Sequence, residues 1–255
     1  MKGDRPIAIV TGASRTGRVG LAIAAELARA GCDLVLTARD AASVPKVGLP
    51  EALGGVTVRW EAVDLDDPER AEELGKTLAR QLPRCDVLVH NASVYEPTPL
   101  ESLGVEDGLR HYRVNALSPL MLSAALAGAL GRSAIPGGGA IVAMCDIHAM
   151  GELGQARRDF AAYGMSKAAL LEMVMVLARA LAPRVRVNAV APGVVAFATS
   201  GHESDEAMQR AYLRRVPLER AGTPEDAARA VRWLALEAAY CTGQVVRVDG
   251  GRAIT

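Results

Sequence analysis

The stretch "TGASRTGRVG", residues 11–20, lies between an apolar segment and a segment with helical periodicity. The residues that lead into it, "IAIVTG", have the pattern of a strand, and "VGLAIAAELARAG" has the pattern of an amphipathic helix. The glycine-rich stretch is therefore predicted to be the first strand-to-helix turn. Free backbone N–H groups and the helix dipole meet at such a turn, so it is suited to binding phosphate.

The glycines of this turn have an unusual spacing. Gly12, Gly17 and Gly20 fit neither G-x-G-x-x-G nor T-G-x-x-x-G-x-G, because two extra residues lie between the first and the last of them. The helix still begins at the expected place, so we interpret the stretch as a widened turn that keeps its function. It supplies five predicted cofactor-binding residues: Gly12, Ser14, Arg15, Gly17 and Gly20.

Short apolar runs alternate with helical stretches along the whole chain of 255 residues. The predicted strands cover 6–12, 32–38, 56–64, 85–91, 139–145, 184–193 and 244–251. The predicted helices cover 19–31, 67–82, 106–130, 159–183 and 223–238. Strand–helix alternation of this kind predicts an α/β fold, a doubly wound parallel sheet with helices on both faces. No boundary or repeat interrupts the pattern, so one domain is expected over residues 1–255.

Composition narrows the class of protein. Half of the residues are hydrophobic, and 29 basic residues balance 29 acidic ones, so a nucleic-acid partner is not expected. The apolar run near the N-terminus is too short for a signal peptide or a membrane span, which predicts a cytoplasmic protein without a membrane partner. The four histidines show no ligand spacing, so no metal site is predicted. Scattered cysteines predict reduced core thiols: Cys32, Cys85, Cys145 and Cys241.

The end of the second predicted strand, "LTARD", bears on the choice of cofactor. In a dinucleotide-binding fold an acid at this point holds the ribose of NAD. Ala38 occupies that position here, Arg39 follows it, and Arg15 in the turn is a second cation. A missing acid with added arginines favours the 2′-phosphate of NADP(H), although Arg39 as an ordinary surface cation is the alternative. Asp64 ends the third predicted strand.

The stretch "YGMSK" carries the candidate catalytic pair. Tyr163 and Lys167 are four residues apart on a predicted helix and so share one face. A tyrosine has a pKa of about 10, and a nearby ammonium lowers that pKa. Such a pair can protonate a carbonyl oxygen as hydride arrives. The alternative is a surface tyrosine that happens to lie near a lysine.

With these motifs in order, the chain resembles the short-chain dehydrogenase/reductase family over almost its whole length. The resemblance rests on "TGAS", "HNAS" at 90–93, "RVNALSP", "YGMSK", "NAVAPG" at 188–193 and "TGQVVRVDGG". It implies a single Rossmann-type domain with a seven-stranded sheet. It also implies a role for Asn115 in supporting a proton-relay water, and for Lys167 in holding the nicotinamide ribose. Further cofactor contacts are implied for Asp64, Asn91, Ala92, Pro192, Gly193 and Thr199.

One departure from the family concerns the end of the fifth strand, where a serine is usual. No serine lies between Cys145 and Tyr163, and the nearest equivalent is Asp146. Residues around 151–159 form a predicted inserted loop. The aspartate and "NASVYEPTPL" resemble pteridine-reductase-like members of the family, which implies a pterin-like substrate and a catalytic or binding role for Asp146. A carboxylate donates no hydrogen bond unless it is protonated, so Asp146 is no simple stand-in for serine. A solvent-facing Asp146 is the alternative.

The predicted function is that of an NADPH-dependent reductase acting on a small carbonyl or pterin-like substrate. The alternatives are a ketone, enone or acyl-thioester reductase, with Asp146 or Cys145 bordering the pocket, and an NADP-binding sensor without turnover. Residues 196–216 have a polar start and a helical end and are expected to cover the substrate. The family implies a homotetramer, and the helices at 106–130 and 160–182 carry enough apolar surface to form its interfaces.

Overall fold

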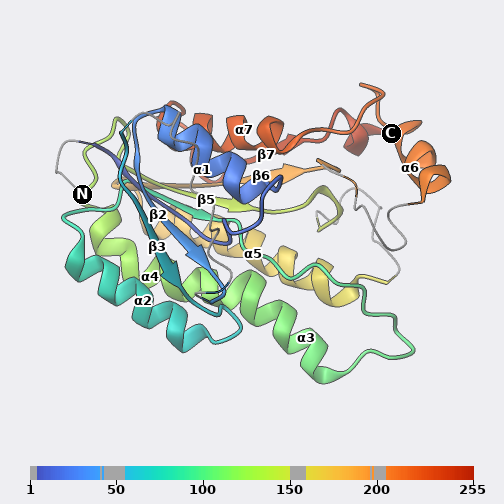
Figure 1. Ribbon diagram of the computed structural model, residues 1–255, viewed down its shortest axis with the longest axis horizontal. Coiled ribbons are helices and arrows are strands. Elements are labelled where there is room, and N and C mark those ends of the chain that lie inside the picture. The colour runs from blue at the N-terminus through green and yellow to red at the C-terminus, as the bar shows by residue number, and fades with distance from the viewer. Residues whose placement is uncertain (1–4, 41, 43–54, 150–158, 196, 198–204) are drawn as a thin grey trace.

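A seven-stranded parallel sheet forms the centre of the protein (Figure 1). The computed structural model describes residues 5–40, 42, 55–149, 159–195, 197 and 205–255. The strand order is β3-β2-β1-β4-β5-β6-β7. The strands are β1 (Ile7–Val10), β2 (Asp33–Ala38), β3 (Val58–Ala62), β4 (Val87–His90), β5 (Gly139–Met144), β6 (Val185–Pro192) and β7 (Val245–Val248). The predicted strands and their parallel arrangement are confirmed.

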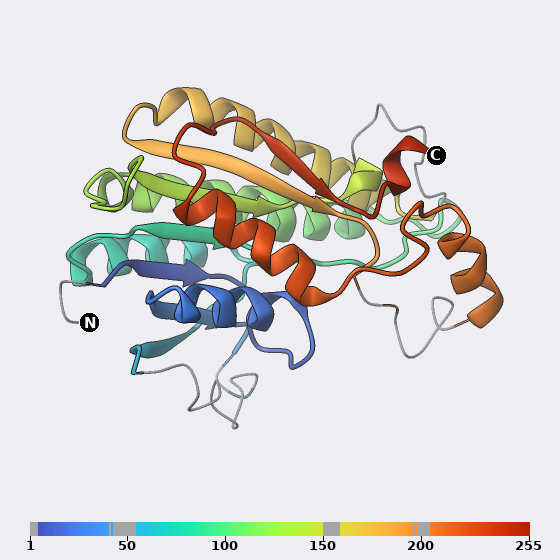
Figure 2. The same cartoon turned by 90° about the horizontal axis from the view of Figure 1, so that it is seen from above.

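Helices cover both faces of the sheet, as predicted (Figures 1 and 2). α1 (Val19–Arg29) and α7 (Pro224–Leu236) pack together on one face. α2 (Pro68–Gln81), α4 (Ser118–Leu130) and α5 (Ala161–Ala180) cover the other. The central strands β1, β2, β4 and β5 are buried along their entire length, which explains their continuous apolar sequences.

Two helices begin with side-chain capping interactions. The Asp67 carboxylate accepts hydrogen bonds from the backbone N–H groups of Glu69 and Arg70, at 3.1 and 3.2 Å. Thr223 forms a capping box, because its hydroxyl accepts from the N–H of Asp226 while the Asp226 carboxylate accepts from the N–H of Thr223. These contacts satisfy N–H groups that a helix leaves without internal partners.

The predicted single helix at 106–130 is wrong in one respect. It is divided into α3 (Val105–Tyr112), a π-helical turn (Arg113–Leu117) and α4. Pro119 has no N–H to donate to the carbonyl of Asn115 four residues before it, so regular α-helical bonding is interrupted there. Asn115 thus lies in a widened turn of the kind that is frequent at functional sites.

A buried arginine joins β6 to α7. Arg186 is 5% exposed. Its guanidinium donates to the carbonyl oxygens of Leu234 and Ala235, at 2.6 and 2.7 Å. It also donates to the carbonyls of Ala238, at 3.0 Å, and Gly137, at 3.2 Å. Three of these four carbonyls lie at or just after the end of α7, where a helix has unpaired oxygens and negative dipole charge.

Two helical stretches are long and apolar enough to cross a membrane by length and composition, Val105–Leu130 and Ala161–Ala180. In their most apolar windows, 56% and 44% of the residues are buried inside the structure. Core helices of globular proteins give the same signal. Both stretches also leave apolar side chains exposed: Leu109, Tyr112 and Leu120 on the first, and Met165, Met175 and Val176 on the second.

His90, the last residue of β4, is buried as a neutral side chain. Its Nε2 atom lies 2.7 Å from the hydroxyl of Ser123. Burial, followed by the charge of Lys167, lowers the pKa of His90 to about 3. An unfolded chain would hold this histidine at a pKa of about 6.5, so the unfolded state takes up the proton first as the pH falls.

We expect His90 to contribute to loss of stability in acid. The free energy of unfolding falls as the pH drops from about 6.5 toward 3, by up to about 1.4 kcal/mol per pH unit from this one group. His90→Gln removes the titrating ring and keeps a hydrogen-bonding group, so its acid slope should be shallower. Urea unfolding at pH 7.5, 6.5 and 5.5 measures this difference, and equal slopes for both proteins would contradict it.

Candidate active site

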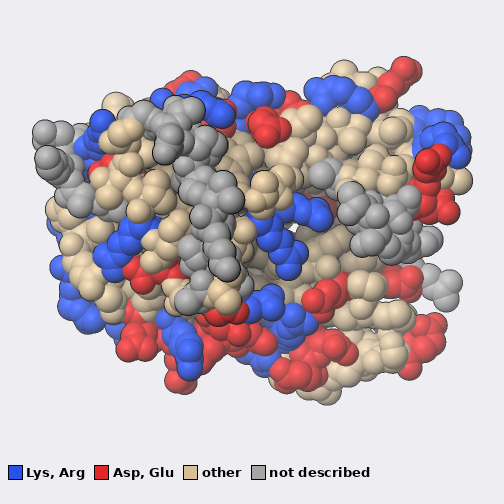
Figure 3. Space-filling model, in the orientation of Figure 1, with Lys and Arg blue, Asp and Glu red and all other residues tan. Residues whose placement is uncertain are grey.

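A cavity of about 1270 Å³ lies at the carboxyl ends of the strands, the edge where open α/β sheets bind ligands. Its volume exceeds the roughly 300–1,000 Å³ of drug-sized sites, which leaves room for a dinucleotide and a substrate. Figure 3 shows Lys and Arg side chains bordering the hollow on this face. The predicted site residues in its wall are Gly12, Ser14, Arg15, Gly20, Arg39, Asp64, Asn91, Ala92, Asp146, Tyr163 and Gly193.

The floor of the cavity is built by the first turn and the end of β4. The Asn91 side-chain amide donates to the carbonyl oxygens of Thr11 and Gly12, at 2.9 and 3.0 Å. A Cβ on Gly20 would lie only 2.5 Å from the Gly12 carbonyl oxygen, so this helix start tolerates no side chain. The backbone around the turn is therefore bare, which is the arrangement a pyrophosphate requires.

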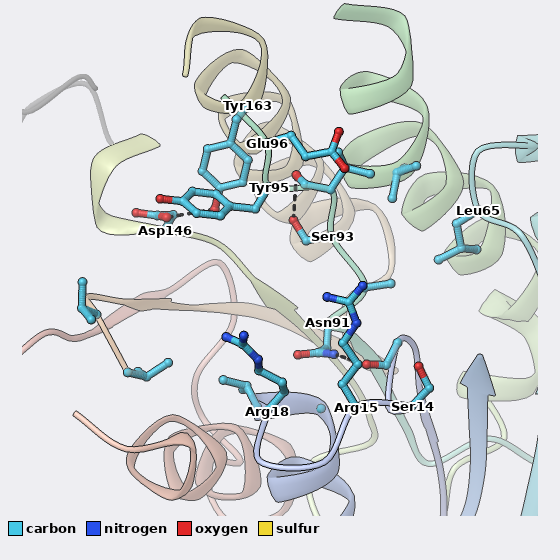
Figure 4. A pocket seen from close by; sticks show the side chains of 18 of the residues that line it. Ser14, Arg15, Arg18, Leu65, Asn91, Ser93, Tyr95, Glu96, Asp146 and Tyr163 are labelled. Atoms are coloured by element: carbon cyan, nitrogen blue, oxygen red, sulfur yellow. Dashed lines mark hydrogen bonds between the residues drawn. The ribbon is translucent and has the colours of Figure 1, made fainter. Parts of the chain in front are cut away.

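The two extra residues widen the turn without displacing the helix. Gly17 has a φ of +70° and does not contribute to the cavity wall. α1 begins at Val19, and Arg18 occupies the N-cap position without a side-chain cap. Figure 4 shows Arg15 and Arg18 reaching from this turn into the cavity. Arg18 was not among the predicted site residues. Its position directly before the predicted helix could have indicated a role in binding phosphate.

Three arginines line this side of the cavity. Within the described residues, the side chains of Arg15, Arg18 and Arg39 form no ion pair or hydrogen bond. Cations that face a cavity without a carboxylate partner fit a phosphate-bearing ligand such as a dinucleotide. Asp64 is exposed in the wall and accepts from the N–H of Asp66 at 3.0 Å. Asp40, which follows Arg39, also lines the wall, an acid that sequence reasoning had not considered.

Tyr163 and Asp146 meet at the opposite side of the cavity (Figure 4). The Tyr163 hydroxyl donates to the Asp146 carboxylate at 2.9 Å. The other carboxylate oxygen accepts from the backbone N–H of His148 at 2.8 Å, which fixes the group after β5. The structure thus brings this predicted pair together, with Asp146 as the acceptor. A serine at the same point could also donate, and an ionised carboxylate cannot.

Lys167 lies behind Tyr163 and outside the cavity wall. Its Nζ donates to the Met144 carbonyl at 2.8 Å and lies 5.8 Å from the centre of the Tyr163 ring. Burial lowers the pKa of Lys167, while the neighbouring Cys145 and Asp146 partly oppose that shift. The ammonium thus lies beside the Tyr163 ring, next to the end of β5.

Asn115 is 1% exposed, and its side chain is fully hydrogen-bonded. Its amide nitrogen donates to the Val94 carbonyl and the Ser166 hydroxyl, at 3.0 and 2.9 Å. Its oxygen accepts from the N–H of Val94 at 2.8 Å and from the Ser93 hydroxyl at 3.1 Å. The side chain lies outside the cavity wall and fastens the segment after β4 to α5.

An aromatic cluster borders the reactive pair. The Tyr95 ring lies edge-on to Tyr163, with ring centres 4.9 Å apart, and stacks on Phe160 at 4.8 Å. Tyr95 lines the cavity. Sequence reasoning missed this residue, because only the fold brings the chain after β4 against the start of α5.

Described residues that follow β6 line another part of the cavity. Gly193 lies in the wall and Pro192 does not, while Thr199 falls outside the described residues. Of the predicted covering segment 196–216, the described part includes α6 (Glu206–Leu213). Four residues on or just after this helix line the cavity: Met208, Ala211, Tyr212 and Arg215. The predicted inserted loop lies mostly outside the described residues.

The cysteines are not part of the cavity wall. Cys145 is buried beside Asp146, and burial raises the pKa of its thiol to about 11. The same cause raises the pKa of Cys32 to about 12. Cys145 therefore does not border the pocket, contrary to one of the expectations. Among the residues that the structure describes, no group of three His, Cys, Asp or Glu side chains is placed to hold a metal.

Comparisons with known proteins agree with this geometry. A family model described as "Enoyl-(Acyl carrier protein) reductase" matches residues 12–253. An oxidoreductase of Mycobacterium tuberculosis is 32% identical, over 97% of this chain and 92% of its own. A 3-oxoacyl-[acyl-carrier-protein] reductase of Synechocystis is also 32% identical, over 96% of both chains.

The comparison with solved structures also finds a relative of similar fold and sequence. A protein from Beutenbergia cavernae, described as an NAD(P)-dependent gluconate 5-dehydrogenase with NADP bound at low occupancy, superposes with a TM-score of 0.87. It is 34% identical, and the match covers 98% of this chain and 97% of the other. These comparisons give no specific support to the resemblance to pteridine reductases. The chain belongs to the short-chain dehydrogenase/reductase family and is an NAD(P)-dependent oxidoreductase.

Proposed function

We propose that the protein is an NADPH-dependent reductase of a small carbonyl compound, with Tyr163 as the proton donor. The observation that carries this proposal is a tyrosine hydroxyl on the cavity wall, hydrogen-bonded to Asp146 and backed by the buried ammonium of Lys167. On the other side of the same cavity lie a bare glycine turn and three arginines that form no ion pair with the described residues, Arg15, Arg18 and Arg39.

The residues divide into a binding set and a proton-transfer set. The backbone around Gly12 and Gly20 is suited to hold the pyrophosphate of the dinucleotide, and the nicotinamide supplies the hydride. Tyr163 gives its proton to the carbonyl oxygen as hydride reaches the carbonyl carbon. The ammonium of Lys167 stabilises the phenolate that remains. Asn115 fastens the segment after β4 to α5, and the proton-relay role that the family implies for it stays a prediction.

NADP(H) is the proposed cofactor. Ala38 puts no carboxylate at the last position of β2, although Asp40 lines the wall two residues later, and Arg39 and Arg15 lie in the wall near that point. A 2′-phosphate would be their natural partner. The related protein from Beutenbergia cavernae contains NADP, which supports the same choice.

The descriptions of two relatives favour a carbonyl compound as the substrate. Relatives described as 3-oxoacyl-[acyl-carrier-protein] reductases from Synechocystis and Pseudomonas aeruginosa support reduction of a carbonyl. A pterin-like substrate is the second candidate, favoured by the flat ring of Tyr95 next to the Asp146–Tyr163 pair. A sensor without turnover is the third, and the intact tyrosine and lysine speak against it.

We propose a cytoplasmic homotetramer. The exposed apolar side chains of α3, α4 and α5 would be covered if these helices paired symmetrically with a second copy. A second exposed set on α7 and near the end of the chain, Trp233, Tyr240 and Ile254, offers surface for another contact. A monomer in light scattering at micromolar concentration would contradict this assembly.

Tyr163→Phe should abolish most of the turnover. The change removes the hydroxyl and keeps the ring that packs against Tyr95, so the fold and NADPH binding should survive. Loss of a general acid predicts a fall in kcat of about 10²–10⁴-fold. NADPH oxidation with a panel of carbonyls and dihydropterins measures it, with Tyr112→Phe outside the cavity as the control. Unchanged turnover would reject Tyr163 as the proton donor.

Cofactor preference should depend on Arg39 and Ala38. Arg39→Ala removes a charge-assisted contact to the 2′-phosphate, so we expect KM for NADPH to rise by about 10-fold or more and KM for NADH to change little. Ala38→Asp should turn the preference toward NADH by repelling the phosphate. Arg179→Ala, an exposed arginine on α5, is the matched control. If the wild-type protein binds both cofactors equally well, the proposed preference is wrong.

Asp146 should affect turnover through its contact with Tyr163. For a pterin-like substrate, both Asp146→Ala and Asp146→Ser should lose activity on dihydropterins. Asp146→Ser restores a hydroxyl that can donate to a carbonyl, so it should keep or gain activity on simple ketones. Steady-state rates of the three proteins on both substrate types test this. Wild-type behaviour of Asp146→Ala on every accepted substrate would show that Asp146 has no role in the reaction.

A further inference from the structure

A second group of cations lies in the part of the cavity formed by α6 and the end of the chain. Arg252 begins a short 3-10 helix (Arg252–Ile254) and is only 2% exposed, yet it contributes to the cavity wall. Arg215, just after α6, lines the wall from an exposed position. The roles proposed above for the cofactor and for Tyr163 use neither residue.

The guanidinium of Arg252 lacks a full set of partners. Its Nε is buried without a hydrogen bond, and Nη1 makes only two contacts of 3.4 Å, to the carbonyl and hydroxyl oxygens of Thr255. The neighbouring Asp249 uses its carboxylate to accept from the N–H groups of Gly251 and Ala253, at 2.9 and 2.8 Å. Within the described residues, Arg252 forms no ion pair. Burying a cation in this state is costly, and an anionic ligand would remove the cost.

Tyr212 supplies a second polar group next to this cation. Its ring centre lies 5.5 Å from the Arg252 guanidinium carbon. Its hydroxyl accepts from the N–H of Val194 at 3.2 Å, which leaves its own proton available to a ligand. Burial lowers the pKa of Arg252, and the charge of Arg215 lowers it further. The two arginines therefore repel each other, and an anion between them would relieve that repulsion.

The same contacts connect this group to the reacting tyrosine. Burial raises the pKa of Tyr212, and the charge of Asp146 contributes to that rise, so the two side chains are within electrostatic range. Asp146 in turn accepts the hydrogen bond from Tyr163. Tyr163, Asp146, Tyr212 and Arg252 all line the same cavity.

We propose that Arg252, Arg215 and Tyr212 form a subsite for the carboxylate of the substrate, which makes the substrate an oxo acid. The inference rests on the proposed reductase function and names the class of carbonyl compound. Hydride from NADPH bonds to the carbonyl carbon, the C=O double bond becomes a single bond, and its oxygen takes the proton of Tyr163. The products are a hydroxy acid and NADP⁺.

This subsite separates the candidate substrates. An apolar acyl chain at this end of the cavity would cover a cation without neutralising it, which is unfavourable. A pterin offers a carbonyl oxygen and ring nitrogens that accept hydrogen bonds from a guanidinium but carry no negative charge, so it leaves both cations unneutralised. A carboxylate accepts two parallel hydrogen bonds from one guanidinium and a third from a tyrosine hydroxyl.

The test compares 2-, 3- and 4-oxo acids of four to six carbons with their methyl esters. Each ester keeps the reacting carbonyl and removes the negative charge. With NADPH, the best acid should exceed its ester in kcat/KM by about 10- to 100-fold, the value of a charge-assisted contact. Equal kcat/KM for acid and ester would overturn the subsite. A phosphorylated ketone that outperforms every oxo acid would overturn the choice of carboxylate.

Variants of the subsite residues test whether the difference in kcat/KM between acid and ester arises at this subsite. Arg252→Gln should lower kcat/KM for the acid to that of the ester and leave the ester unchanged, and Arg252→Lys should recover part of the loss. Arg215→Gln should have a smaller effect of the same sign. Arg214→Gln, the adjacent exposed arginine outside the wall, is the control. If Arg252→Gln lowers acid and ester turnover equally while thermal unfolding is unchanged, the arginine does not bind the carboxylate.

A binding measurement keeps the inference separate from the reductase proposal. Isothermal titration of the hydroxy acid products into the NADP⁺-saturated protein needs no turnover. Binding that is lost in Arg252→Gln and kept in Tyr163→Phe supports the subsite even if no carbonyl is reduced. Reduction of esters alone, without binding of any hydroxy acid, upholds the reductase and overturns the subsite. Thermal unfolding and NADPH binding of each variant show whether it is folded. If Arg252→Gln does not fold, the exposed Arg215→Gln provides the test of carboxylate binding.

Discussion

The hydrogen bonds of Asn91 to the first turn hold together the two halves of the cofactor side of the cavity. The strand order changes direction between β1 and β4, and the crevice of a doubly wound sheet opens at that point. Asn91 extends from the end of β4 to the carbonyls of Thr11 and Gly12 and fixes the turn over the crevice. The absence of a side chain at Gly20 allows this approach, and every group on the cavity floor is placed relative to it.

Much of the fold could be predicted because its signals are local. Apolar runs predicted the strands, and the predicted helices 67–82 and 223–238 begin at Asp67 and Thr223, which the structure shows as caps. The division of the long helix by a π-helical turn was missed, since apolar periodicity through 106–130 is nearly unbroken. Pro119 was the only sequence signal of this division. A proline in the first turn is also common in ordinary helices, so the signal was ambiguous.

Site residues could be predicted where a sequence motif occurs at the expected place in the fold. They could not be predicted where only the fold brings residues from distant segments together. Tyr163 and Asp146 lie on different elements. The motif "YGMSK" predicted Tyr163, and the absence of the usual serine at the end of the fifth strand predicted Asp146. Tyr95 and Arg252 carried no such signal, and Tyr212 lay in the predicted covering segment 196–216 without being singled out. They reach the cavity from the segment after β4, from α6 and from the end of the chain, and their spacing in the sequence contains no trace of that convergence.

The single charge of Arg186 makes two distant segments behave as one cooperative unit. Its guanidinium ties β6 to the carbonyls of Leu234 and Ala235 in the last turn of α7 and to that of Ala238, which also accepts from the N–H of Cys241. Local opening of α7 would leave a buried cation and several carbonyls unpaired together, so the helix is not free to fray by itself. Because β6 continues into Gly193 and Val194, amide protons in this part of the cavity wall should exchange only on global unfolding.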